Sequence, residues 1–465
     1  MSWKTVVDGA IVVGYVVLLA GMALWSGRAV KSGAAFATGE KKYGPWVIFA
    51  TLSASYVGGG YSSGNAAAAF SSGIGTTCTL LGFSLSMIYI ARRLVPGVGR
   101  FAGISTVGGV MERMYGRRAR IVTGWLSFLC CAGVVGAQMQ TMGVVLNQLL
   151  GVSRTAGVLV GAAVVLAYTT FGGLQSVIVA DVLQFILMAV GMPLLLLAGV
   201  RACGGWDALW EAVPPAYWNP LGGFSPAAFI SMFLAMALGE ALAPPYTQRL
   251  LVGQNAEATA KGTLWSGLFS APFFVMTGLV GLVAFALQVT TDSAQAMPAL
   301  IHAVLPVGAR GVVMAAMVSI LLSASDSFLN SATIGLIADG ITPWYPLSER
   351  GQLWGMRIAN VATGLLGVTM ALLLEDVFSI LMTAYAFWCP LLLAPLAAAF
   401  AGWSLSPKGF WCGMTAGFAA MVIWNFLLKQ PAGVDGGVVG MLCNGIVCTF
   451  FPRAEREKCE TAGRL

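Results

Sequence analysis

Residues 52–64 read Leu-Ser-Ala-Ser-Tyr-Val-Gly-Gly-Gly-Tyr-Ser-Ser-Gly and lie in the middle of an apolar stretch that is long enough to cross a membrane. Each of the three consecutive glycines lowers helix propensity by about 1 kcal/mol relative to alanine, which favours a short unwound segment. Unwound backbone at membrane depth is tolerated only where it lines a cavity or is satisfied by protein, water, ion or substrate. The alternative is close helix packing through small residues, since Gly60 and Gly64 have GxxxG spacing.

A second interruption follows at residues 239–249, which read Gly-Glu-Ala-Leu-Ala-Pro-Pro-Tyr-Thr-Gln-Arg. The proline pair removes two backbone donors and bends or ends the helix, and Glu240 lies several residues deeper. The two breaks fall at equivalent places in consecutive five-span blocks, 45–200 and 227–402. This arrangement indicates an inverted-repeat secondary transporter, in which substrate would bind at the breaks near the middle of the bilayer.

The composition indicates a polytopic, all-α membrane protein, because 58% of the 465 residues are hydrophobic, 9% are charged and the mean hydropathy is +0.83. Apolar stretches predict about thirteen transmembrane helices, and the connections between them are too short to fold independently. The expected spans are 8–26, 45–72, 76–95, 120–150, 155–171, 176–200, 227–246, 262–288, 309–340, 355–374, 377–402, 409–428 and 433–451.

The spans divide the chain into an extra helix with the first loop (1–44), an inverted-repeat core (45–402) and two further helices with a short tail (403–465). With the N-terminus outside, 20 of the 25 Lys and Arg residues fall on the cytoplasmic side, which predicts a cytoplasmic C-terminus. The expected location is the plasma (inner) membrane, with lipid around the spans. The net charge of +7 then reflects topology, and no nucleic-acid footprint is expected. A cleaved signal peptide is the alternative for the first span, but cleavage near Ser26 would export the basic loop behind it.

A polar stripe runs along the span at 309–340. Its members fall at i, i+4, i+7, i+8 and i+11, so they share one helix face. A carboxylate at bilayer depth normally faces a bundle interior or a watery path, and the stripe therefore predicts a permeation or coupling-ion site. The stripe consists of Ser319, Ser323, Asp326, Ser327 and Asn330.

Other kinds of site find little support in the sequence. The nine cysteines are dispersed, although Cys78 and Cys203 could both lie near the outer face and pair. The single histidine, His302, has no second histidine or cysteine nearby, so no metal site is expected. No phosphate-binding loop is present, which argues against transport driven directly by ATP. Neither an enzyme activity nor an organic cofactor is expected.

Several separate stretches match motifs of one known family. They are Tyr168-Thr169 and Gly172-Gly173-Leu174 with Asp181 and Gln184, then 323–327 with 329–331, then 106–116, and finally Gln248-Arg249. Together these stretches, which lie within residues 36–400, resemble the sodium:solute symporter family. The resemblance implies the leucine-transporter fold, with a five-plus-five inverted repeat. The Ser-Tyr-Val-Gly-Gly-Gly-Tyr string is more similar to the choline-transporter branch than to the sugar branch.

The resemblance implies a sodium site on the backbone carbonyls of Ala54, Val57 and Ile320 and on the hydroxyl of Ser323. Sodium is a hard cation, and carbonyl and hydroxyl oxygens suit it. The family commonly has a second hydroxyl where this chain has Ala324, a departure that would weaken the site or leave a water in its place. The matching motifs also imply an ion path past Asp181, Asp326 and Ser327; the alternative for Asp181 is that it caps a helix or pairs with another residue at a cytoplasmic helix end.

A solute would bind at the two breaks, and tyrosine rings there could form an aromatic face toward an ammonium group. Glu240 has three interpretations: a counter-ion for a cationic substrate, a proton carrier, or a partner of Arg249. The expected solute-binding residues are Tyr56, Gly58, Gly59, Gly60, Tyr61, Glu240 and Tyr246.

The function expected from these residues is symport of a small polar organic solute, amino-acid-like, zwitterionic or cationic, coupled to Na⁺ by alternating access. A proton-coupled or sodium-independent transporter of the same fold is the main alternative, because a carboxyl desolvated in a helix bundle can carry H⁺ near neutral pH. A channel and a transporter-like sensor are further alternatives.

Overall fold

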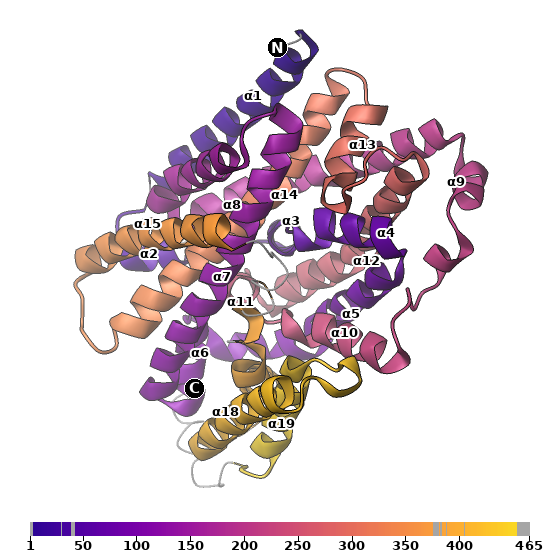
Figure 1. The fold of residues 1–465 in the computed structure, drawn as a ribbon. Coiled ribbons are helices and arrows are strands. Elements are labelled where there is room, and N and C mark those ends of the chain that lie inside the picture. Colours follow the sequence, from indigo (N-terminus) through magenta and orange to yellow (C-terminus); the bar gives the residue numbers. More distant parts are fainter. Residues whose placement is uncertain are drawn as a thin grey trace.

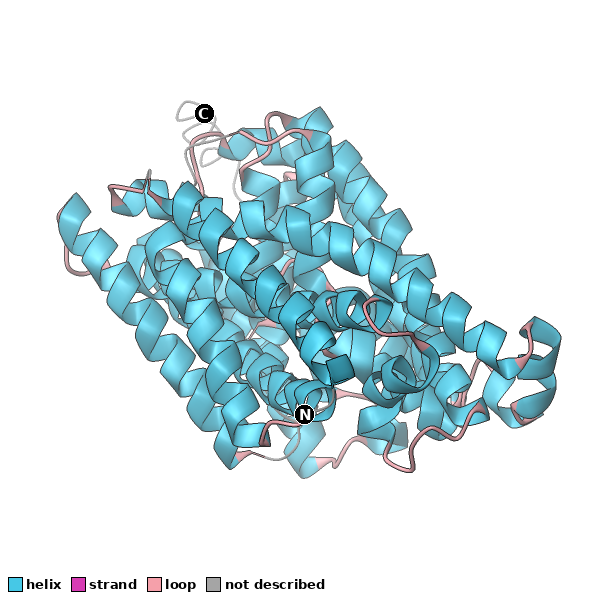
Figure 2. Ribbon diagram, turned by 90° about the horizontal axis from the view of Figure 1, so that it is seen from above, coloured by secondary structure: helices cyan, strands magenta, loops and turns pink. Residues whose placement is uncertain are grey.

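Helices account for nearly all of the computed structural model, which describes residues 3–28, 30–38, 42–374, 381, 384–386, 388–403 and 405–452 (Figures 1 and 2). In this part of the chain, β-pairing is limited to two isolated bridges. The α-helices are α1 (Trp3–Gly27), α2 (Gly33–Thr38), α3 (Pro45–Tyr56), α4 (Asn65–Ser72), α5 (Gly75–Tyr89), α6 (Val107–Tyr115), α7 (Arg117–Leu150), α8 (Arg154–Cys203), α9 (Trp206–Ala212), α10 (Pro226–Gly239), α11 (Pro244–Leu251), α12 (Ala256–Ala286), α13 (Ala296–Val304), α14 (Ala309–Ile334), α15 (Glu349–Leu373), α17 (Ala394–Ala401), α18 (Pro407–Val422) and α19 (Gly436–Thr449).

Short π- and 3₁₀-helical segments extend or join several of these helices. The π-helical segments are η1 (Gly60–Gly64), η2 (Ile90–Leu94), η6 (Gly335–Ile341), η7 (Cys389–Leu393) and η8 (Ile423–Leu427). The 3₁₀ segments are η3 (Val95–Phe101), η4 (Pro215–Trp218), η5 (Ser293–Gln295) and η9 (Pro431–Gly433).

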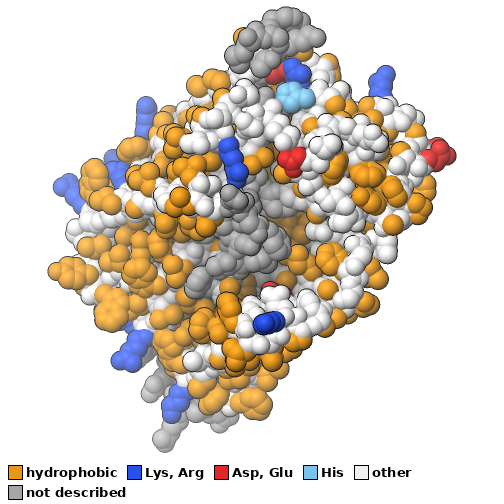
Figure 3. All heavy atoms as spheres, in the orientation of Figure 1, with side chains coloured by type: hydrophobic (Ala, Val, Ile, Leu, Met, Phe, Trp, Pro, Cys, Tyr) orange, Lys and Arg blue, Asp and Glu red, His pale blue; other side chains and the backbone are white. Residues whose placement is uncertain are grey.

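Nine helices of the described residues are long and apolar enough to cross a membrane, or ten if the bent pair α10 and α11 is one span. These ten become the thirteen expected spans when three more are added. Helix α8 counts as two spans because of its kink, and the α3–α4 pair and the 14-residue α19 count as one span each. Hydrophobic side chains cover much of the face seen in Figure 3, as a lipid-facing surface requires. The expected span 377–402 falls partly, and the tail after residue 452 wholly, outside the described residues.

The first predicted break is confirmed, because α3 ends at Tyr56 and helical structure resumes at Gly60. The Gly58 amide donates to the Tyr56 carbonyl at 2.7 Å, and Val57 between them has φ −73° and ψ 81°. This is an inverse γ-turn. In a continuous helix the Gly58 amide would bond to the Ala54 carbonyl, so the turn releases that carbonyl from its usual partner.

The glycine run also serves close packing. A Cβ on Gly58 would lie 3.1 Å from the Ala324 Cβ, and one on Gly59 would lie 2.9 Å from the Thr141 side chain. The close approach therefore occurs at the break itself, against α7 and α14, while a Cβ on Gly60 would meet only Leu381 at 3.8 Å. The unwinding is therefore confirmed, whereas the close packing falls on Gly58 and Gly59 and not on the expected pair Gly60 and Gly64.

The second predicted break is also confirmed, with α10 ending at Gly239 and α11 beginning at Pro244 with a bend of 43°. The proline pair occupies the first turn of α11, where a missing amide hydrogen costs nothing. Glu240 is the C-cap residue of α10 and therefore lies in the break itself.

A third irregularity divides α8. Gly173 has φ 54° and ψ −156°, which only glycine adopts without strain, and a Cβ there would lie 2.6 Å from the Phe36 carbonyl oxygen. The half that follows this kink carries Asp181.

Helix α14 lies inside the bundle, with every residue from Val313 to Ile334 buried, and it packs against α7 and α8 (Figure 1). Helices α18 and α19 pack on each other at the C-terminal end of the fold. Cys78 and Cys203, for which pairing was left open, are both free thiols in the structure.

Candidate functional site

The unwound segment after α3 is held by α7. Gln138, which is 5% exposed, accepts a hydrogen bond from the Gly59 amide at 2.9 Å. Gly58 lies against Ala324, so the break contacts α14 at the residue directly after Ser323. The backbone that the sequence assigned to a sodium site therefore lies next to the part of α14 that supplies the assigned hydroxyl.

Asp181 is the point where four helices meet. Its fully buried carboxylate accepts hydrogen bonds from Ser323 of α14 at 2.6 Å and from Thr51 of α3. It also forms an ion pair with Arg249 of α11 at 2.9 Å, in which both side chains are fully buried. The sequence placed Asp181 and Ser323 in different roles, and the structure brings them into direct contact.

Arg249 connects these groups. Its guanidinium donates to Thr51 at 2.9 Å, to the Pro245 carbonyl at 2.9 Å and to Ser327 at 2.6 Å, in addition to Asp181. A buried charge needs such a set of partners, because burial without them costs several kcal/mol. Arg249 is thus bonded to Asp181, and the interpretation that pairs it with Glu240 is wrong.

Asp326 and Ser327 continue the network along α14. Asp326, which is fully buried, accepts a hydrogen bond from the Tyr168 hydroxyl at 2.6 Å and a longer one from Ser327 at 3.3 Å. The Ser327 hydroxyl lies 3.0 Å from that of Ser55 in α3. The remaining members of the polar stripe lie apart, since Ser319 donates to its own helix and Asn330 has no hydrogen-bond partner among the described residues.

Glu240 lies in a separate cluster of tyrosines. Its carboxylate, in a residue that is 7% exposed, accepts hydrogen bonds from the hydroxyls of Tyr61, Tyr246 and Tyr385. These donors come from the segment after the first break, from α11 and from the segment before η7. The second break therefore carries a carboxylate that is held by hydroxyl groups.

The tyrosine rings pack on neighbouring aromatic rings. Tyr56 is 1% exposed, its ring lies 4.8 Å from that of Phe83, and its hydroxyl donates to the Ser266 carbonyl. Tyr61 stacks on Phe274 at 4.9 Å. The expected aromatic face toward an ammonium group is therefore occupied by other rings of the protein in this conformation.

The oxygen atoms near the first break suit sodium. The Ala54 carbonyl has lost its helical partner, Val57 is the central residue of the turn, and Ser323 projects from the adjacent α14. Ile320 lies one turn before Ser323 on the same helix. The carboxylate of Asp181, which accepts a hydrogen bond from Ser323, adds a charged oxygen next to the assigned hydroxyl.

Sequence reasoning assigned no role to Gln138, Tyr385, Thr51 and Ser55, and it did not identify the partners of Arg249. Arg249 was recognised as part of a motif, and a lone cation at the end of an apolar span is a signal that it has a buried partner. Tyr385 and Gln138 carry no such signal, because a single polar residue in a span has many positions where it can be satisfied.

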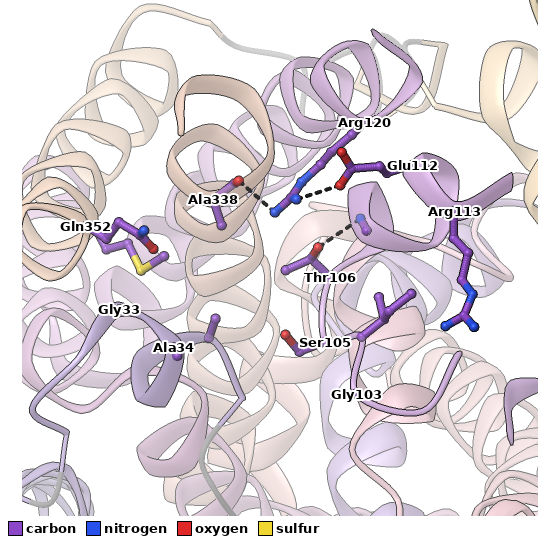
Figure 4. Close-up of a pocket in the computed structure, with 14 residues that line it drawn as sticks. Gly33, Ala34, Gly103, Ser105, Thr106, Glu112, Arg113, Arg120, Ala338 and Gln352 are labelled. Carbon is purple, nitrogen blue, oxygen red and sulfur yellow. Dashed lines mark hydrogen bonds and ion pairs between the residues drawn. The ribbon is translucent and has the colours of Figure 1, made fainter. Parts of the chain in front are cut away.

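A separate cavity of about 360 Å³ lies beside the ends of α2, α6, α7 and η6, and none of the expected site residues lines it (Figure 4). Arg120 at its wall forms ion pairs with Glu112 at 2.7 Å and with the nearly buried Asp339 at 2.9 Å. Asp339 also accepts hydrogen bonds from Thr106 and from the Gly108 amide. This network joins α6 and α7 to η6, the segment that follows α14.

Comparison with known proteins gives consistent matches. Residues 36–403 match the profile of a family described as "Sodium:solute symporter family". Human high affinity choline transporter 1 is 26% identical over 408 residues, which cover 80% of this chain and 68% of the relative. The high-affinity proline transporter PutP of Bacillus subtilis is 27% identical over 261 residues, which cover 53% of this chain and 55% of the relative.

The fold also has solved counterparts. The substrate-bound outward-open state of a Na⁺-coupled sialic acid symporter matches 96% of this chain and 97% of its own chain with a TM-score of 0.83, at 15% sequence identity. Mhp1, a nucleobase-cation-symport-1 family transporter, matches 92% of this chain and 98% of its own chain with a TM-score of 0.60. These likenesses confirm the expected leucine-transporter fold.

Proposed function

Because this chain belongs to the sodium:solute symporter family, it is a sodium-coupled solute transporter that works by alternating access and not an enzyme, and we propose that its cargo is a small organic solute of the amino-acid-like, zwitterionic or cationic class. The observation that carries the proposal is the pair of broken helices, α3–α4 and α10–α11, each with buried polar groups at the break. The choline and proline transporters among the relatives support a solute of this size.

We place the coupling sodium at the first break, on the carbonyls of Ala54, Val57 and Ile320 and the hydroxyl of Ser323. The adjacency of this backbone to α14 supports the assignment. Asp181 would attract the ion from the cytoplasmic side of the site, since its carboxylate already contacts Ser323 at 2.6 Å. Asp326 and Ser327, which extend the same network, would line the ion path.

The solute would occupy the space between the two breaks. Gly58 and Gly59 bring unwound backbone to it, and Gly60, the first residue of η1, is exposed. The side chains of Tyr56, Tyr61, Glu240 and Tyr246 would complete the site from both breaks. For Tyr56 this role requires a change of packing, because its ring is enclosed in the present conformation.

The membrane topology of the proposal follows the distribution of basic residues. The N-terminus lies outside and the C-terminus in the cytoplasm, in a plasma (inner) membrane. Uptake would then run from the outer side toward the side that carries the cavity beside Arg120.

Uptake in proteoliposomes tests the function. The purified protein is reconstituted, an inward sodium gradient or an inward pH gradient is imposed separately, and accumulation of radiolabelled choline, proline and related solutes is followed. Accumulation above the outside concentration with sodium alone, abolished by a sodium ionophore, is expected. Accumulation that follows only the pH gradient would replace sodium by protons as the coupling ion, and fast equilibration without accumulation would indicate a channel.

A further inference from the structure

We propose that Glu240 and its three tyrosines recognise a cargo ammonium group that carries at least one N–H, in preference to a quaternary ammonium. This inference rests on the proposed function, because it names the solute class for the same site. It begins from the unusual position of a carboxylate in the break of a membrane helix.

The electrostatic surroundings of Glu240 favour a cation. Only 7% of Glu240 is exposed, and among the described residues no Lys or Arg forms an ion pair with it. It caps the C-terminus of α10, where the helix dipole adds partial negative charge. A buried carboxylate at a helix C-terminus is costly unless a positive charge or a proton joins it.

The Glu240 carboxylate can accept at least one more hydrogen bond. A carboxylate offers about four acceptor positions, roughly two on each oxygen. Tyr246 and Tyr385 both donate to Oε1, whereas only Tyr61 donates to Oε2. The free position on Oε2 can accept an N–H, and such a charge-assisted hydrogen bond is stronger than a neutral one. A trimethylated nitrogen has no hydrogen to place there.

Two of the three tyrosine rings, those of Tyr61 and Tyr246, do not offer the alternative mode of recognition. A quaternary ammonium is usually bound by open ring faces. The ring of Tyr61 stacks on Phe274 at 4.9 Å with an interplanar angle of 22°, and it lies 5.5 Å from the ring of Phe83. Tyr246 is enclosed by Tyr56, Phe83 and Phe328. The rings of Tyr61 and Tyr246 are therefore covered by other rings, whereas the Glu240 carboxylate keeps an unused acceptor position.

Paired probes test this preference. Each pair differs only in N-methylation: glycine with glycine betaine, and ethanolamine with choline. Glucose and acetate serve as probes without an ammonium group. Sodium-driven accumulation and sodium-dependent thermal stabilisation are both measured, for the wild type, for Glu240→Gln and for the control Glu257→Gln, whose side chain is 76% exposed.

The expected result is that an N–H member of a pair accumulates and stabilises the protein at least about tenfold more effectively than its trimethylated partner, which corresponds to one good hydrogen bond. Glu240→Gln should lose this discrimination, and Glu257→Gln should keep it. The wild-type comparison does not depend on any variant and remains decisive if Glu240→Gln fails to fold.

Three outcomes overturn the inference while the proposed function stands. They are sodium-driven accumulation in which the trimethylated members are preferred, accumulation of glucose or acetate alone, and an N–H preference that Glu240→Gln retains. A pH gradient that drives uptake only when Glu240 is present would also overturn it, because the carboxyl would then carry a proton. Absence of sodium-driven accumulation for every probe would instead refute the proposed function.

Discussion

Replacement of Arg249 by methionine tests the buried network most sharply. The change keeps much of the side-chain volume but leaves Asp181 fully buried without its ion-pair partner. Breaking a buried ion pair by removal of one partner typically costs about 3–5 kcal/mol, whereas replacing both partners costs much less. In the double variant Arg249→Met/Asp181→Asn, the amide oxygen can accept from the hydroxyl of Thr51 or Ser323 while the amide nitrogen donates to the other hydroxyl, so this variant should recover most of the loss.

The size of the effect can be expressed as a melting temperature. With an unfolding entropy of about 2.1 cal/mol/K per residue, a chain of 465 residues changes its Tm by about 1 °C per kcal/mol. Arg249→Met should lower the apparent Tm in detergent by about 3–5 °C, and the double variant by about half as much or less. The assay is thermal unfolding of all variants at one scan rate and detergent concentration. Strict additivity of the two single changes would refute the ion pair as the source of the effect.

Three further substitutions separate the site from its scaffold. Ser323→Ala should raise the sodium concentration for half-maximal uptake severalfold, whereas Ser325→Ala, which removes a hydroxyl bonded only to the helix backbone, should leave it unchanged; equal responses would remove Ser323 from the ion site. Gly173→Ala should cost about 1–3 kcal/mol through its backbone conformation, while Gly21→Ala, with no atom within 4 Å of the new Cβ, should be neutral or stabilising in thermal unfolding. Arg120→Leu should lower stability by about 1–3 kcal/mol, since two carboxylates lose their partner, and an unchanged Tm would show that the ion pairs contribute little.

The sequence predicts the breaks well because their causes are local. Three glycines and a proline pair act on their own helices, and α3 and α10 end within a few residues of the expected positions. The kink at Gly173 was expected as a turn between two spans, and the structure places a glycine-specific conformation there. Local backbone chemistry thus determines where each helix stops.

The partners of the polar groups could not be predicted in the same way, because they are set by tertiary packing. Arg249 reaches Asp181 across 68 positions of the sequence, and Tyr385 reaches Glu240 across 145. Helical periodicity places Ser319 and Ser323 on one face, yet only Ser323 faces another helix's carboxylate. The local sequence determines which residues share a helix face, but it does not determine which other helix packs against that face.

The central claim is that sodium and solute are held together at the unwound segment, and labelling of Gly60→Cys tests it most directly. Gly60 is exposed and a Cβ there would have 3.8 Å to its nearest neighbour, so the thiol should be tolerated and reactive. A membrane-impermeant maleimide is added to the variant and, in parallel, to the wild type, whose own cysteines set the background. Sodium together with a transported solute should slow the Gly60→Cys reaction in proportion to occupancy. A rate that stays constant at concentrations that saturate uptake would contradict a binding site at this break.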